Sequence, residues 1–165
     1  MLPRLYITLP DSVDEISTYI RRSWYAEGRI VSYEIFDISR AIVNEWSNLT
    51  IETIRSWPPG QPYLALHDIS HRGVAMKYSG LHLNIINPAI TDEGKERLFK
   101  LLKEDVHFRG YIAPLVSIHF SGYFTRVLTA KELQRQSAPH MQYKIFTERE
   151  AALRWLEGVI NPKKG

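Results

Sequence analysis

The fold is decided first by residues 16–36, which read ISTYIRRSWYAEGRIVSYEIF. The part before Glu27 is rich in β-branched and aromatic residues, and the part from Arg29 to Phe36 alternates between apolar and polar residues. Glu27-Gly28 separates the two runs, and glycine readily adopts the positive φ that a tight turn needs. The segment therefore predicts an antiparallel β-hairpin.

A helix and a buried strand follow the hairpin. Asp37 or Ser39 supplies an N-cap for a helix that runs to about Ser56, and Pro58-Pro59-Gly60 ends it. The next apolar run, from Pro62 to Ile69, lacks clean alternation, which suits a strand covered on both faces.

The second half of the chain continues the alternation of helices and strands. Its predicted elements are a helix from Thr91 or Asp92 to Glu104, a strand from Gly110 to Ile118, a helix from Ser121 to about Gln136, and a strand from Met141 to Phe146. A capping box, Thr147-Glu-Arg-Glu150, then predicts a closing helix. That helix has an apolar face of Ala152, Trp155, Leu156 and Val159.

These elements predict one α/β domain over residues 1–165, in the order β-β-α-β-α-β-α-β-α. Strands joined through helices run parallel, so the sheet is mixed: an N-terminal antiparallel hairpin, then parallel strands, with helices packed on the sheet. Residues 1–14 are expected to form an extension or an edge segment. The pattern over residues 74–90 assigns neither a helix nor a strand.

Composition excludes several classes of protein. The chain has no cysteine, which rules out a disulfide framework, a thiol nucleophile and a cysteine zinc site. Its 44% apolar residues are enough to build a core, so we expect no metal or cofactor. The net charge of +3 is small and its basic residues are scattered, which argues against nucleic acid as a partner. Without a signal-peptide or membrane-spanning stretch, we expect a cytoplasmic protein.

Short catalytic motifs are missing as well. The chain has neither of the glycine-rich phosphate loops and no Gly-x-Ser-x-Gly elbow. His67 and His71 are four residues apart but end a predicted strand, so the helical logic of a zinc site does not apply. We therefore predict no catalytic residue and no metal ligand.

The order of elements resembles the STAS superfamily, the anti-sigma-factor-antagonist fold, and especially its STAS-like and SEC14-like cytoplasmic relatives, over residues 16–160. The resemblance is carried by Ile30-Val-Ser-Tyr-Glu-Ile-Phe36, by Tyr63-Leu-Ala-Leu-His-Asp-Ile-Ser70, and by the closing strand and helix from Tyr143 to Leu156. It implies a regulatory α/β module, with a phosphorylated serine after the middle strand. Ser79 of Ser79-Gly80-Leu81 falls near that place, but Lys77 and Tyr78 depart from the family's motif, so a turn or helix-start role for Ser79 is preferred.

Polar residues gather where two predicted parallel strands end. In open parallel sheets, ligands bind outside the carboxyl ends of the strands. If the two strands are neighbours, one crevice would be lined by Asp68, Ser70, His71, Arg72, His119 and Ser121. A helix N-terminus beside arginine and histidine would favour an anion. The alternative is that the aspartate and the two serines are ordinary turn and cap residues.

The leading functional hypothesis is a non-enzymatic STAS-like module that binds a protein partner or a small ligand at this crevice. One alternative is a small enzyme acting on an anionic or acyl substrate there, with His119 or His71 as its base. Another is a lipid-binding domain, which would need a deep apolar cavity. A homodimer is compatible with each of these hypotheses.

Overall fold

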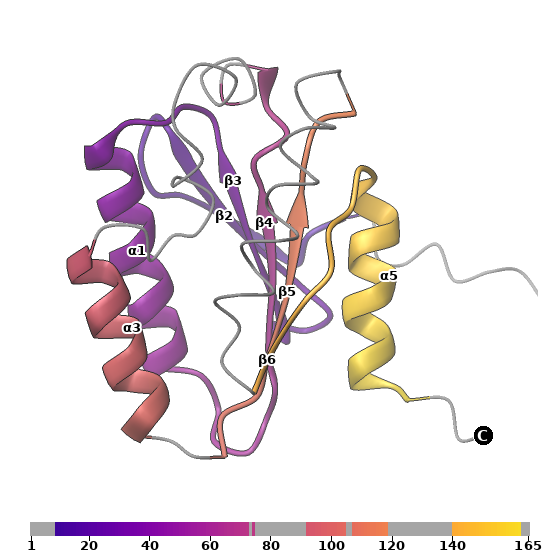
Figure 1. Ribbon diagram of the computed structural model, residues 1–165. Helices are drawn as coiled ribbons and strands as arrows, with labels where there is room; N and C mark the ends of the chain where they lie inside the picture. The colour runs from indigo at the N-terminus through magenta and orange to yellow at the C-terminus, as the bar shows by residue number, and fades with distance from the viewer. Residues whose placement is uncertain (1–8, 73, 75–91, 105–106, 119–139, 163–165) are drawn as a thin grey trace, which may run out of the picture.

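The arrangement of helices and strands follows from a computed structural model that describes residues 9–72, 74, 92–104, 107–118 and 140–162 (Figure 1). The described elements, in chain order, are β1 (Ser12–Glu15), β2 (Ile20–Tyr25), β3 (Ile30–Ile35), α1 (Arg40–Arg55), β4 (Tyr63–Asp68), α3 (Asp92–Glu104), β5 (Gly110–Leu115), β6 (Met141–Tyr143) and α5 (Arg149–Ile160). The helix predicted over residues 121–136 and the undecided stretch 74–90 lie, apart from Val74, outside the described residues.

The strands form one mixed sheet in the order β1-β2-β3-β4-β5-β6. Strands β1 to β3 pair antiparallel, whereas β3 to β6 pair parallel. This confirms an α/β sheet with an antiparallel N-terminal part followed by parallel strands. Spatial order equals chain order, and the described helices α1 and α3 lie in the chain between the parallel neighbours β3 and β4 and β4 and β5.

The N-terminal part contains one strand more than the sequence pattern indicated. The first strand of the hairpin was expected to start at Ile16, but residues 16–19 turn the chain between β1 and β2, with the amides of Ile16 and Ser17 donating to the carbonyl of Ile20. Strand β1 therefore lies at the edge of the sheet. Its residues are mostly exposed and carry two acidic side chains, which explains the weak apolar signal and suits an edge strand.

The β2–β3 turn lies where the hairpin prediction placed it. Gly28 has φ +76°, and two non-glycine residues, Ala26 and Glu27, also have positive φ at 56° and 58°. Three successive left-handed residues make this a tight turn whose conformation is costly for side chains other than glycine. The turn positions the following residue, Arg29, whose amide and Nε both donate to the carbonyl of Ala26.

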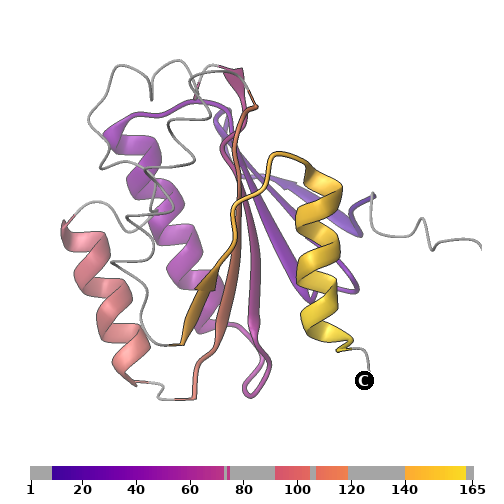
Figure 2. The ribbon, with the colours of Figure 1, turned by 45° about the vertical axis from the view of Figure 1, so that its right-hand side comes forward.

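Helices cover both faces of the sheet. Helices α1 and α3 lie on one face and α5 on the other, as both views show (Figures 1 and 2). The α1 side contains the larger apolar cluster, which includes Trp46, Tyr33 and Tyr63. The α5 side contains a second cluster that joins Leu64 and Leu66 of β4 to Leu153 and Leu156 of the helix. Alternate residues of each strand point to opposite faces, so neighbours in sequence belong to different cores.

The N-caps predicted for α1 and α5 have different outcomes. Ser39 is the N-cap of α1, and its side chain accepts a hydrogen bond from the amide of Ile42 at 3.3 Å, as one of the two predicted caps required. The capping box at Thr147 is wrong, because the N-cap of α5 is Glu148, which makes no side-chain cap hydrogen bond. The helix starts one residue later, where Arg149 reaches back to the sheet.

The apolar face of α5 is also shifted slightly from the expected one. Ala152 and Leu156 are buried as predicted, whereas Trp155 and Val159 are only partly buried at the border of the cluster. Leu153, which the expected face left out, is buried in their place. The helix therefore rests on β4 and β5 through a stripe that contains Ala152, Leu153 and Leu156.

Candidate functional site: a charged network at the carboxyl ends of the strands

The carboxyl ends of β4 and β5 lie side by side. These strands are hydrogen-bonded neighbours in parallel, with Asp68 opposite Leu115, and the amide of Ile69 continues the pairing by donating to the carbonyl of Leu115 at 3.0 Å. The two strands are therefore adjacent, which is the condition under which the residues that follow them could share one crevice. Of the residues expected there, His119 and Ser121 lie outside the described residues, as does Ser79.

Asp68 and Ser70 hold each other in a turn. The Oδ1 atom of Asp68 accepts hydrogen bonds from the backbone amide of Ser70 at 3.0 Å and from its Oγ at 2.6 Å. This is the local side-chain-to-backbone pattern by which aspartate stabilises turns. These contacts agree with the alternative in which Asp68 and Ser70 are ordinary turn residues.

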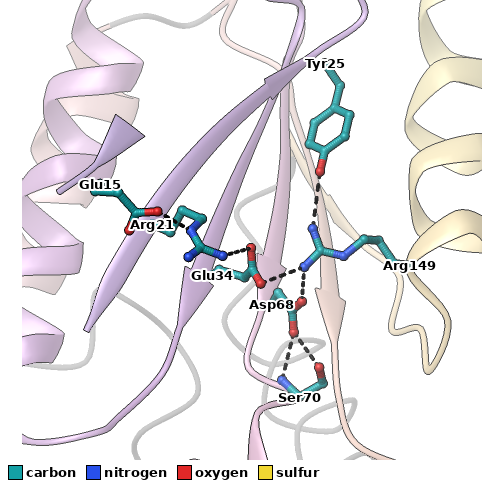
Figure 3. Close-up of polar contacts among 7 residues, drawn as sticks. All are labelled: Glu15, Arg21, Tyr25, Glu34, Asp68, Ser70 and Arg149. Atoms are coloured by element: carbon teal, nitrogen blue, oxygen red, sulfur yellow. Dashed lines mark hydrogen bonds and ion pairs between the residues drawn. The ribbon is translucent and has the colours of Figure 1, made fainter. Parts of the chain in front are cut away.

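The second oxygen of Asp68 binds a residue that comes from far along the chain. Arg149, the first residue of α5, directs its Nη2 to Oδ2 of Asp68 at 2.5 Å and to Oε1 of Glu34 at 3.3 Å (Figure 3). Its Nη1 donates to the hydroxyl of Tyr25 at 3.2 Å. Glu34 and Asp68 are partners in the β3–β4 register, so both carboxylates leave the sheet on the face that α5 covers.

The network continues toward the sheet edge through a second arginine. Arg21 of β2 lies 2.6 Å from Glu15 of β1 and 3.8 Å from the other oxygen of Glu34 (Figure 3). Charges along it alternate, carboxylate then guanidinium, from β1 to the start of α5. Three carboxylates and two guanidinium groups leave one net negative charge, so the network as a whole does not attract an anion.

Burial makes the inner part of this network stronger than the outer part. The side chain of Asp68 is 9% exposed and that of Arg149 30%, whereas Glu15 is 63% exposed. Burial by itself lowers the pKa of the Arg149 guanidinium, but Asp68 first and Glu34 second raise it, and the result lies above the ordinary value. Arg149 therefore stays charged and ties the N-terminus of α5 to β3 and β4.

The other two expected residues on this edge are on the surface. His71 and Arg72 are exposed, and the His71 ring lies edge-on to Phe36, with ring centres 5.5 Å apart. Ile118, just beyond β5, is an exposed large apolar residue at 79%. Arg72 follows β4 and Ile118 follows β5, so the adjacent strands bring a cation and an apolar side chain to one edge of the sheet.

His67 belongs to the opposite face and to a different environment. Its ring packs edge-on against Tyr33 and Trp46, at centre distances of 5.5 and 5.2 Å. Burial lowers its pKa from 6.5 to about 3, so the imidazole is neutral at physiological pH. Among the described residues, no group of three or more histidine, cysteine, aspartate or glutamate side chains is arranged to hold a metal ion.

Sequence reasoning missed Glu34, Arg149 and Tyr25. A signal was present for two of them: Glu34 is a charge within an apolar strand, and Arg149 opens a helix that directly follows a strand. A buried charge requires a partner, so each indicated an ion pair without identifying the other member. The partners are separated by 115 residues in the chain, and only the sheet order brings them together.

The lengths of the helices and comparisons with known proteins add two findings. None of its described helices is both long enough and apolar enough to cross a membrane. No protein-family model, curated protein or solved structure matches the chain, and the resemblance to the STAS superfamily stays a prediction from the sequence.

Proposed function

We propose that this protein is a non-enzymatic, STAS-like binding or regulatory module, which recognises a protein partner or a small ligand at the carboxyl ends of β4 and β5. The observation that carries the proposal is that an exposed cation, Arg72, and an exposed apolar side chain, Ile118, follow the carboxyl ends of two adjacent strands. Exposed apolar groups beside polar ones are typical of recognition surfaces.

The charged network supports binding rather than catalysis. A general acid or base has to exchange a proton with substrate, and its pKa has to suit that task. Asp68 and Glu34 are each bound to arginine, and Asp68 is further held by Ser70, so their oxygens are already engaged by groups of the chain itself. These carboxylates act as positioning groups: they fix the start of α5 and the turn after β4, and so keep the edge rigid.

The test is site-specific photo-crosslinking in cells. A photoreactive phenylalanine analogue at position 118 should give a discrete adduct, and the Arg72→Glu substitution should remove it. The matched control places the same analogue at position 9, because Leu9 is also highly exposed but lies at the other end of the described chain. Identical adducts at both positions would contradict the proposal.

The enzyme alternative gives a different result in the same set of variants. It predicts turnover of an acyl ester or a phosphate ester that falls when His71 is replaced by glutamine. It makes no prediction about crosslinking at position 118. Turnover lost in His71→Gln, together with no specific adduct at position 118, would therefore favour the enzyme over the binding module.

A further inference from the structure

A cavity lies at the opposite end of the sheet from the charged network. It has a volume of about 260 Å³ and is lined by Arg29, Gln61, Pro62, Leu64, Val159 and Ile160. Leu64 is the second residue of β4, Arg29 directly precedes β3, and Val159 and Ile160 form the last turn of α5. The cavity is therefore walled by the amino ends of two strands and the carboxyl end of a helix.

The walls combine apolar side chains with a single charge. Four of the six lining residues are apolar, and Leu64, one of them, is almost fully buried. Gln61 adds one amide and Arg29 the cation. Ligand sites commonly have this composition, in which an apolar surface supplies affinity and a few polar groups set orientation.

Arg29 is held in place but not neutralised. The β2–β3 turn positions it, and its Nε donates to the carbonyl of Ala26 at 3.0 Å. A guanidinium has five N–H donors, so its four terminal N–H groups are left. Within the described part of the chain, no carboxylate lies within ion-pair distance of Arg29. The side chain is partly buried, which makes an unpaired charge more costly than on an open surface.

The carboxyl end of α5 does not cancel this charge. The last turn of a helix carries about half a negative charge, and α5 has no basic residue of its own there. The full positive charge of Arg29 exceeds that partial charge, so a positive site remains at the cavity wall. A planar carboxylate fits such a site, because it pairs with the two terminal nitrogens of a guanidinium.

We propose that this cavity binds a small apolar carboxylic acid, with the carboxylate on the terminal N–H groups of Arg29 and the hydrocarbon part against Leu64 and Val159. The volume limits the size of the ligand, since pockets for drug-sized molecules start at roughly 300 Å³. This site is independent of the proposed function at the carboxyl ends of the strands, so either can fail without the other.

The experiment is a titration of the full chain with hexanoate, followed by amide chemical shifts in two-dimensional NMR. Hexanoate should shift the signals of Arg29, Leu64 and Val159, while hexanol, which has the same chain without the charge, should bind at least tenfold more weakly. Arg29→Gln should weaken hexanoate binding by about tenfold, the loss expected for one charge-assisted contact.

Two more variants keep the test decisive if Arg29 also supports the fold. Gln61→Glu places a negative charge on an exposed lining residue and should weaken hexanoate binding without lowering the melting temperature. Arg154→Gln, on the exposed side of α5, is the matched control and should leave binding unchanged. Equal binding of hexanol and hexanoate, or shifts that do not involve the cavity residues, would overturn the proposal.

Discussion

The two faces of the sheet carry different kinds of side chain under their covering helices: ion pairs on the α5 face and uncharged aromatic groups on the α1 face. At one step of the β3–β4 register, Glu34 lies opposite Asp68, and the α5 face carries a network of ion pairs. At the preceding step, Tyr33 lies opposite His67, and the α1 face buries uncharged aromatic groups. A shift of one residue therefore changes the chemistry completely, because successive side chains of a strand point to opposite faces.

Burial explains why the two solutions differ. Tyr33, His67 and Trp46 are almost fully buried, and a charge there would lose its hydration without compensation. On the other face, α5 covers β4 and β5 but leaves the arginine end of the network partly open to water. Charges are tolerated at that border since each one has an opposite charge as a neighbour.

The largest expected effect concerns the α1 face. Replacing Trp46, which is completely buried, by alanine should lower the free energy of unfolding by about 3–5 kcal/mol, the usual cost of emptying a buried aromatic site. Trp155→Ala on the α5 face should cost less than half as much, because that ring is only partly buried. Chemical denaturation of both variants measures the difference, and equal losses would show that the two cores contribute equally.

The next effect concerns the inner ion pair of the α5 face. Asp68→Asn should lower the free energy of unfolding by about 2–3 kcal/mol, because it leaves the partly buried Arg149 with a weaker partner. Arg149→Met removes the other member, and the double variant should lose less than the sum of the two single losses. Additive losses in this double-mutant cycle would mean that the pair does not couple α5 to the sheet.

The pH dependence of stability tests the α1 face. The pKa of His67 is about 3 in the folded chain and 6.5 in an ordinary one, so between these values the unfolded chain binds a proton that the folded chain does not. The free energy of unfolding should therefore fall as the pH drops below about 6.5, by up to about 1.4 kcal/mol per pH unit.

A pair of histidine variants isolates this contribution. His67→Leu should flatten the slope of stability against pH between pH 5 and 6.5, whereas His140→Gln should leave it as in the parent, because His140 is exposed. Unfolding followed by circular dichroism at several pH values gives both slopes. If the slope survives in His67→Leu, the acid sensitivity does not come from His67.

The smallest expected effect is at the outer end of the network. Arg21→Gln removes contacts to Glu15 and Glu34, but all three side chains reach solvent, so the loss should be below about 1 kcal/mol. Added salt should reduce it further. A loss as large as that of Asp68→Asn would show that the network acts as one unit from β1 to α5.

The sequence by itself determined the helices and turns that depend on a few neighbouring residues. The hairpin turn at Gly28, the end of α1 before Pro58 and the span of α3 were all predicted, and Ser39 was one of two predicted caps of α1. Turn chemistry, capping and apolar periodicity act over a few residues, so a sequence can indicate them. The mixed character of the sheet followed as well, since parallel neighbours require a crossover and antiparallel ones need only a turn.

Only the tertiary structure decided which distant residues meet. Asp68 and Ser70 were expected at the carboxyl end of β4, and the described contacts show them as turn residues. Asp68 is also bound to Arg149, which no local pattern connected with it. The sequence predicted a cap at Thr147, whereas the N-cap of α5 is Glu148. The ion pairs of Arg149, the first residue of the helix, with Glu34 of β3 and Asp68 of β4 appear only in the tertiary structure. Charge pairing across a sheet is set by strand order and register, and these depend on the packing of the whole chain rather than on any single segment.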